Sequence, residues 1–394
     1  MTAVGFEPPA YPYDRLVALR ERAGAHPGGM VDLSVGTPSD PPPPGVLAAL
    51  ADADRGGALR GYPPSVGTSS LRAAAARWIA ATFALDVASG ALSSDAVAAC
   101  VGTKEMVASL PRHLALRHPG RDTVLCPQVA YPTYRMGAVL AGLRAVAVGG
   151  DEDGRLDLSS IAAADAERAL LLWVNSPGNP TGRLEDLGAA ASWGTSRGVI
   201  VASDECYAPF TWAGPARTVL GHGAGAGGLG GVLAVHSLSK RSNLAGLRVG
   251  WIAGDPDLVH YLAEVRKHAG MMVPGPAQAA AVAALDDEAH VVEQRHRYRR
   301  RLEAMAAILA AAGVEVAGPE GGFYLWAPAP GGDPWAWAAE LAERGGVVIA
   351  PGDLYGPAGA THARLAMVAP LQRLELVASR LGVVFAVGPR QPLG

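Results

Sequence analysis

Short apolar runs rich in β-branched residues alternate with segments of helical periodicity up to about residue 275. The apolar runs predict strands over Val97–Val101, Thr123–Cys126, Ala145–Val148, Ala169–Val174, Val199–Ser203, Val232–His236 and Arg248–Ala253. The periodic segments predict helices over Ser69–Ala84, Lys104–Leu116, Tyr134–Ala141, Glu185–Arg197 and Asp257–Lys267. Repeated strand–helix–strand spacing is typical of an α/β fold with a mostly parallel, doubly wound sheet. Ligands bind such sheets at the carboxyl ends of the strands, so polar residues there are candidates for function.

The pattern changes from about Pro276. A long helix is predicted first, and shorter strands and helices follow it: a helix over Asp287–Ala312, strands near Val314–Val316, Phe323–Ala327, Val347–Ala350 and Ala363–Val368, and helices over Trp335–Arg344 and Leu371–Leu381. We therefore expect a large α/β domain over residues 46–275 and a smaller α+β domain over 276–394. The N-terminal segment, residues 1–45, is expected to pack with the small domain.

The charge balance limits the classes of partner. The chain has 394 residues, with 33 basic and 36 acidic side chains and a formal net charge of −3. Proteins that bind nucleic acid usually show a basic excess, so no nucleic-acid partner is expected. No apolar run approaches the ~18 residues needed to span a bilayer, and no signal-peptide pattern is visible at the N-terminus. We expect a cytoplasmic protein without a membrane partner.

Three other patterns resemble functional motifs, but their sequence context favours a different interpretation. Residues 223–228 match G-x-G-x-x-G, but they precede a predicted strand and open no helix, so a flexible surface loop is expected. The basic run 295–301 is flanked by glutamates and is interpreted as a solvated helix face. Cys100, Cys126 and Cys206 are widely spaced and form no metal-ligand pattern, so no metal is expected.

The lysines carry the most specific signal. There are only three, Lys104, Lys240 and Lys267. Lys240 directly follows a predicted buried strand, with Ser237, Ser239 and Arg248 close by in the sequence. A lysine amine beside hydroxyls and an arginine suits an aldehyde cofactor that carries a phosphate. The amine forms a Schiff base and the other groups hold the phosphate dianion.

Pyridoxal 5′-phosphate has a second requirement that the sequence meets. Its pyridine nitrogen must stay protonated, which requires a carboxylate partner. Asp204 supplies a carboxylate at the end of the predicted strand Val199–Ser203. Tyr207 and Asn179, which also follow predicted strands, are candidate donors to the ring phenolate oxygen.

The cofactor also needs an anion site and a surface for its ring. Gly102, Thr103 and Lys104 begin a predicted helix directly after a strand, and the free N–H groups of a helix start bind phosphate. Tyr131 is a candidate for stacking on the ring.

These motifs resemble those of the fold-type I, class I/II aminotransferases over nearly the whole chain. The matching segments appear in the family's order: 35–38, 61–63, 102–104, 131–134, 175–182, 203–207, 237–240, Arg248 and Arg364. The resemblance implies pyridoxal 5′-phosphate as cofactor, Lys240 as the Schiff-base lysine, and small-molecule substrates, namely amino acids and 2-oxo acids. It also implies that Lys240 acts as general base and acid, with Asp204 and Tyr207 beside it at the catalytic centre.

The resemblance assigns further residues to substrate and subunit contacts. Arg364 would bind the substrate α-carboxylate with both of its terminal nitrogens, close to Asn179. Gly36 would let the backbone approach the same carboxylate. The partner subunit's Tyr62 would reach the phosphate, which implies a homodimer with shared active sites.

Within this family, the chain resembles the actinobacterial N-succinyldiaminopimelate aminotransferases. The similar segments are 11–16, 31–38, 102–105, 203–207, 265–274 and 351–356. The resemblance implies amino transfer from glutamate to N-succinyl-2-amino-6-oxopimelate in lysine biosynthesis. The sequence departs from the expected small hydroxyl residues at Arg241–Asn243, and the loop 223–231 is unusually rich in glycine. The alternatives are a related aminotransferase of another amino-acid or secondary-metabolite pathway, a C–S lyase on the same fold, a regulatory module that binds the cofactor, and a cofactor-free scaffold.

Overall fold

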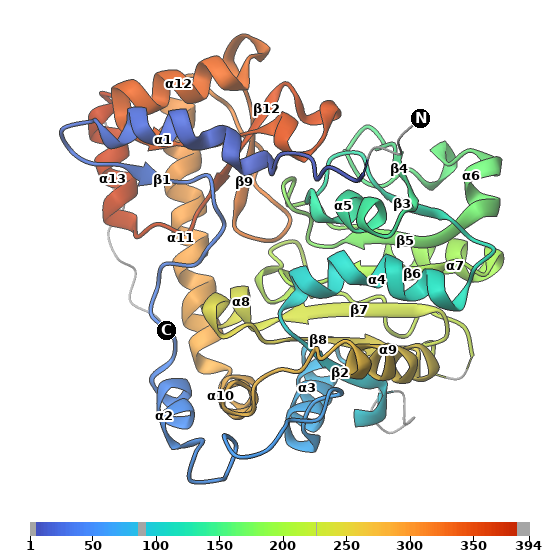
Figure 1. Cartoon of the computed structure of the whole chain (residues 1–394). Coiled ribbons are helices and arrows are strands. Elements are labelled where there is room, and N and C mark those ends of the chain that lie inside the picture. The colour runs from blue at the N-terminus through green and yellow to red at the C-terminus, as the bar shows by residue number, and fades with distance from the viewer. Residues whose placement is uncertain (1–4, 86–91, 226, 384–394) are drawn as a thin grey trace.

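The computed structural model describes residues 5–85, 92–225 and 227–383, and the largest sheet in these ranges has seven strands. Figure 1 shows how helices surround it. The strands are β2 (Val97–Cys100), β3 (Thr123–Pro127), β4 (Arg144–Val148), β5 (Ala169–Asn175), β6 (Ile200–Asp204), β7 (Val232–Ser237) and β8 (Gly250–Gly254). Their order is β2-β8-β7-β6-β5-β3-β4. β8 runs antiparallel to both of its neighbours, β2 and β7, and the other pairs are parallel. The predicted mostly parallel, doubly wound sheet is confirmed.

Helices cover both faces of this sheet because its strands are apolar on both sides. In β5, Trp173 packs on one face and its neighbours Leu172 and Val174 pack on the other. The first face is covered by α4 (Thr103–Arg117), α5 (Thr133–Leu140) and α9 (Pro256–His268). The second face is covered by α3 (Ser69–Thr82), α7 (Leu187–Arg197) and α10 (Gly275–Asp286). The short helix α2 (Pro44–Asp52) packs against α10 and places Val46 in the same core, and α6 (Ala163–Arg168) directly precedes β5.

A separate hydrophobic core is built from both ends of the chain. β11 (Ala350–Pro351), β12 (His362–Ala366) and β9 (Tyr324–Pro328) form an antiparallel sheet in that order, and β1 (Val31–Asp32) pairs with β10 (Val347–Val348). The helices of this part are α1 (Val17–Gly24), α11 (Ala289–Ala311), α12 (Pro334–Gly345) and α13 (Leu371–Arg380). Figure 1 shows α1 and β1 among the C-terminal elements. Because α10 packs into the core of the large sheet, we propose a domain boundary after Asp286 rather than at 275.

Three local predictions differ from the structure. The segment Val314–Val316 forms no strand, because β9 pairs only with β12 within the described chain and leaves this segment without a partner strand. The predicted strand from Arg248 begins at Gly250, since Arg248 adopts a left-handed conformation with φ of 57°. The basic run 295–301 is not a fully solvated face: Arg301 is only 5% exposed, because α11 packs between the two parts of the molecule.

The strand directions bring the chemistry-bearing residues to one edge of the sheet. The carboxyl ends of β5, β6 and β7 carry Asn175, Asp204 and Ser237. Since β8 runs in the opposite direction, its amino end meets the same edge, and Arg248 lies just before it. No helix in the described ranges is long and apolar enough to cross a membrane.

Candidate active site

A cavity of about 530 Å³ opens at this edge of the sheet. Residues from both cores line it. They include twelve of the site residues predicted from sequence: Gly36, Thr103, Lys104, Tyr131, Asn179, Asp204, Tyr207, Ser237, Ser239, Lys240, Arg248 and Arg364. Gly102 lies next to the cavity, against the Arg248 side chain. The structure therefore brings these predicted residues into one place.

Lys240 lies on α8 (Leu238–Arg241), which follows β7 without a loop. Its ammonium group donates a hydrogen bond to the Gly36 carbonyl oxygen. Burial and the nearby Arg364 guanidinium together lower the pKa of Lys240 to about 8. An amine with this pKa is partly neutral near physiological pH, as a nucleophile or proton carrier requires.

Asp204 ends β6 as a buried carboxylate whose two oxygens are both held. One oxygen accepts a hydrogen bond from the Cys206 backbone N–H at 3.2 Å, and the other accepts from the Tyr134 hydroxyl at 2.8 Å. Burial raises the pKa of Asp204. A cationic partner would favour its charged form, so the site suits a protonated ring nitrogen.

Tyr134 was not predicted as a site residue. It lies on α5, three residues after Tyr131, and its ring stacks on Trp173 of the sheet with centroids 5.1 Å apart. In the sequence it looks like any apolar helix position facing a core. Only its hydroxyl, which would be costly to bury without a partner, could have indicated a polar role.

One end of the cavity suits a phosphate. Gly102 caps the start of α4 with φ of 73°, and a Cβ atom there would lie 2.2 Å from the Arg248 guanidinium. The Ser237 hydroxyl donates to Ser239 Oγ at 2.9 Å. A helix start, a guanidinium and hydroxyls that converge in this way form an anion site. The Lys104 side chain instead donates to the Tyr11 hydroxyl at 3.1 Å.

The other end of the cavity is organised around Arg364, which is 2% exposed on β12. Its guanidinium donates to Asn179 Oδ1 at 2.7 Å and to the Ser34 carbonyl oxygen. It also lies 4.3 Å from the centre of the Tyr324 ring. Because these acceptors are neutral, the guanidinium keeps its full positive charge for a substrate carboxylate.

Two further residues that were not predicted hold this end together. The Asn175 side-chain amide donates to the Asp204 carbonyl oxygen at 2.8 Å, and its oxygen accepts from the Asn179 N–H at 2.7 Å. The Tyr324 hydroxyl bonds with the Tyr207 hydroxyl at 2.8 Å. A Cβ atom at Gly36 would lie 2.1 Å from the Tyr324 hydroxyl oxygen, so only glycine fits there.

The cavity carries a surplus of positive charge. Lys104, Lys240, Arg248 and Arg364 line it, and within the described residues none of them lies at ion-pair distance from a carboxylate. The acidic residues that line the same cavity are Asp14 and Asp204. This arrangement is suited to a ligand with several negative charges.

Tyr62 is not part of this cavity. It lies after α2, its side chain is 97% exposed, and it lines a different surface hollow. The role predicted for Tyr62, contact with the phosphate bound by a neighbouring subunit, requires a dimer. For the single chain it is a proposal.

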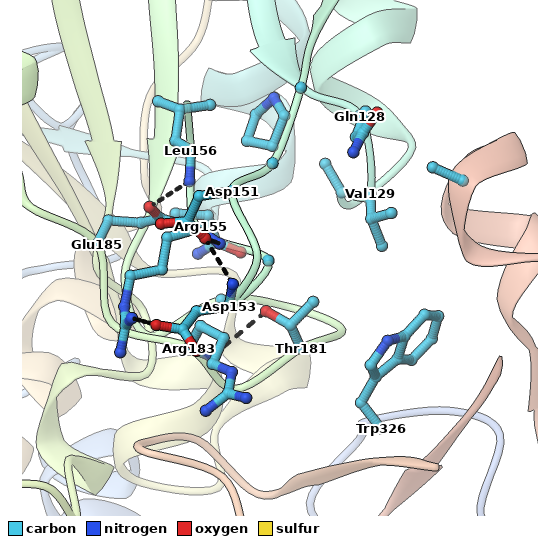
Figure 2. Close-up of a pocket in the computed structure, with 18 of the residues that line it drawn as sticks. Gln128, Val129, Asp151, Asp153, Arg155, Leu156, Thr181, Arg183, Glu185 and Trp326 are labelled. Atoms are coloured by element: carbon cyan, nitrogen blue, oxygen red, sulfur yellow. Dashed lines mark hydrogen bonds and ion pairs between the residues drawn. The ribbon is translucent and has the colours of Figure 1, made fainter. Parts of the chain in front are cut away.

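A second cavity, of about 360 Å³, lies beyond Asn175 and Asn179 and is shown in Figure 2. Its positive charges are already neutralised: Arg155 pairs with Glu320 at 2.5 Å and with Asp153 at 2.6 Å. No lysine lines this cavity. It therefore lacks the groups that an aldehyde cofactor needs. Within the described ranges, no cluster of three or more His, Cys, Asp or Glu side chains could hold a metal ion.

Comparisons with known proteins agree with this chemistry. Residues 28–381 match the family model "Aminotransferase class I and II". The chain is 44% identical over 378 residues to a probable aminotransferase of Mycobacterium tuberculosis, covering 95% of this chain and 85% of the relative. It is 42% identical over 379 residues to the 4-dedimethylamino-4-oxo-anhydrotetracycline transaminase OxyQ of Streptomyces rimosus, covering 95% and 99%. A probable N-succinyldiaminopimelate aminotransferase from Thermus thermophilus superposes with a TM-score of 0.83 at 30% identity, covering 94% and 99%.

Proposed function

The chain belongs to the class I and II aminotransferases, which use pyridoxal 5′-phosphate, and we propose that it transfers an amino group from glutamate to N-succinyl-2-amino-6-oxopimelate in lysine biosynthesis. The observation that carries this proposal is the cavity with a lysine amine, a buried carboxylate and three further cations without carboxylate partners. We further propose that the enzyme works as a cytoplasmic homodimer. The partner subunit's Tyr62 would complete the phosphate site, and the full exposure of this side chain in the single chain supports that role.

The residues of the cavity fit the cofactor group by group. Asp204 would hold the ring nitrogen, and Tyr131 would cover the ring. Tyr207 and the Asn179 amide would donate to the ring oxygen, since Asn179 Oδ1 is already bonded to Arg364. The phosphate would be held by the groups that converge at the other end: the N–H groups at Gly102, Thr103 and Lys104, the hydroxyls of Ser237 and Ser239, and the Arg248 guanidinium.

Lys240 and Arg364 would have different roles in transamination. When bound, the cofactor supplies an electron-accepting ring next to the substrate α-carbon. The Lys240 amine would attach the cofactor covalently at its aldehyde carbon with release of water, and the freed amine would hold or move the proton at the substrate α-carbon. Its pKa of about 8 suits both protonation states. Arg364 would fix the α-carboxylate with two parallel hydrogen bonds, and this holds the α-carbon near the amine.

The cationic surplus supports acidic substrates. A phosphate dianion and one α-carboxylate leave further positive charge at Lys104, near Tyr11 at the wall of the cavity. Glutamate and the succinylated acceptor both carry additional carboxylates that this charge would attract. The name of the Thermus neighbour agrees with this substrate class.

A second candidate substrate is a ketone of a secondary-metabolite pathway. It is favoured by the 42% identity to a tetracycline-pathway transaminase, a match that spans nearly all of both chains. A C–S lyase or a regulatory module that binds the cofactor without turnover would use the same pocket, so kinetics must separate these functions.

The test is a panel of half-reactions. The purified protein is mixed with glutamate, N-succinyl-LL-diaminopimelate or a set of other amino acids, and conversion of the pyridoxal to the pyridoxamine form is followed by absorbance. Fast conversion by the first two supports the proposal. Release of ammonia and pyruvate without formation of glutamate would instead identify a lyase. Binding of the cofactor without conversion by any amino acid would identify a regulatory module, and a colourless protein a scaffold.

Replacing Tyr134 with phenylalanine should weaken cofactor binding by about 10- to 150-fold, because a hydrogen bond to a charged group contributes about 1.5–3 kcal/mol. The variant removes the donor at 2.8 Å from Asp204 and leaves the stacking on Trp173 in place. Fluorescence titration of the apo-protein with pyridoxal 5′-phosphate measures the effect. Tyr261→Phe is the matched control, since that hydroxyl bonds the His113 carbonyl oxygen away from the cavity. Equal affinity in the Tyr134 variant and the wild type would show that this hydroxyl does not support Asp204.

A further inference from the structure

The turn that follows Lys240 is polar and buried. Arg241 is 1% exposed, and Ser242 is fully buried. The Arg241 guanidinium donates to the Ala284 carbonyl oxygen at 2.6 Å, at the end of α10, and the Ser242 hydroxyl bonds with His290 Nε2 at 2.9 Å, on α11. The turn that departs from the expected small hydroxyl residues is therefore fixed to α10 and to α11.

Asn243 extends this attachment toward the N-terminal segment. Its side-chain amide donates to Gln294 Oε1 at 3.2 Å, and the Gln294 amide donates to Asp40 Oδ2 at 2.7 Å. Gln294 is 2% exposed, so both ends of its amide are committed inside the protein. A buried amide with both partners satisfied has one orientation. The hydrogen bonds from Asn243 through Gln294 to Asp40, called the relay below, therefore have a fixed direction.

The relay ends on a carboxylate that is itself fixed. Arg301 donates to the two oxygens of Asp40 at 2.7 Å each. Although burial acts against it, the hydrogen bonds from Arg301 and Gln294 lower the pKa of Asp40, which therefore stays charged. A two-point arginine–carboxylate contact holds both partners in one plane.

Asp40 is four residues from Gly36, whose carbonyl oxygen accepts the hydrogen bond from the Lys240 amine. Pro38 restricts the backbone of the connecting segment. The Ser39 hydroxyl also donates to the Val368 carbonyl oxygen at 2.5 Å. A closed path thus runs from the backbone after Lys240, through the relay, to Gly36 and back to the Lys240 side chain.

We propose that Asn243, Gln294 and Asp40 are positioning residues that hold the Gly36 carbonyl against the Lys240 amine, and so place that amine for proton transfer. This inference rests on the proposed function, because it assigns a task to the amine. The other charged or titratable groups that act on the amine are Arg364, Cys206, Asp204 and Arg248, and the relay touches none of them.

Asn243→Gly is the most direct test. Asn243 has φ of 57°, so glycine keeps the backbone conformation while removing only the amide. We expect kcat to fall about tenfold while KM for glutamate stays within about twofold, because misplacement of a reacting group affects the chemical step. Glu303→Gln, at an exposed position of the same helix, is the control and should leave both constants unchanged.

The apo-protein provides a readout that does not depend on turnover. Only three lysines are present, so the rate at which Lys240 is acylated can be followed by peptide mapping as a function of pH. In the wild type, the half-maximal rate is expected near pH 8. Loss of an acceptor that stabilises the ammonium form should lower this midpoint by about 0.5–1 pH unit in Asn243→Gly. Gln294→Met, which keeps the volume but interrupts the relay, should shift it in the same direction.

A merely structural role would lower the melting temperature without moving kcat or this midpoint, and that result in both variants would overturn the inference. A midpoint that is unchanged or raised would do the same. Failure of the proposed function is distinguishable, because it appears in the wild type: the protein would then convert neither glutamate nor N-succinyl-LL-diaminopimelate, whatever the state of the relay.

Discussion

Replacing Lys240 with alanine should reduce amino transfer on the order of 10⁴-fold and abolish the visible absorbance band that comes from a covalently attached cofactor. General acid–base catalysis alone contributes about 10²–10⁴-fold, and the same amine also forms the covalent bond. Neither remaining lysine is expected to substitute, because Lys104 bonds the Tyr11 hydroxyl and Lys267 is exposed beside Glu264. Stopped-flow absorbance with glutamate and dialysis of the bound cofactor measure the two effects.

The control for this experiment is Lys267→Ala, which removes an amine at the protein surface. It should keep both the band and the rate. An unchanged band in Lys240→Ala would show that the cofactor is bound through another amine, and the assignment of the site would fail. Addition of a small primary amine should restore part of the rate in the alanine variant if proton transfer is the step that was lost.

Arg364→Leu is expected to lower kcat/KM for glutamate by about 10³-fold, since truncating one partner of a buried charged contact costs about 2–5 kcal/mol. The change also leaves Asn179 Oδ1 and the Ser34 carbonyl oxygen without their donor. Arg364→Lys keeps the charge but loses the planar fork, so its loss should be smaller. Steady-state kinetics on both variants measure the difference, after circular dichroism has shown that they fold.

A substrate without a carboxylate separates this role from a general effect on the site. A simple primary amine has nothing for Arg364 to bind, so its slow reaction should be nearly the same in the wild type and in Arg364→Leu. If both substrates lost activity equally, the arginine would be needed for the structure of the cavity rather than for the α-carboxylate.

The sequence was most informative where a functional residue directly follows a buried strand. Asp204 and Lys240 could be placed because an apolar run precedes each of them and parallel strands end at one edge. The reversal of β8 was not visible in its composition. The left-handed conformation of Arg248, which shortens the predicted strand, was equally hidden, because a positive φ at arginine has no sequence signal.

The residues that support the site were missed for a different reason. Tyr134 and Tyr324 are aromatic positions in segments that look like core, and their roles depend on partners more than 60 residues away, Asp204 and Tyr207. Arg301 was interpreted as solvated, because its partner Asp40 is distant in sequence. Such contacts are properties of the tertiary arrangement, and local periodicity does not contain them.

The antiparallel direction of β8 has a consequence for how the chain can vary. Lys240 and Arg248 belong to one short connection between β7 and β8, so both ends of that connection are anchored in the same edge of the sheet. An insertion or deletion between them would displace the Lys240 amine relative to the Arg248 guanidinium, because a connection fixed at both ends cannot absorb a change in length. We therefore expect libraries of random insertions to yield active clones only outside this connection, whose length is a constraint on the enzyme independent of the identity of its residues.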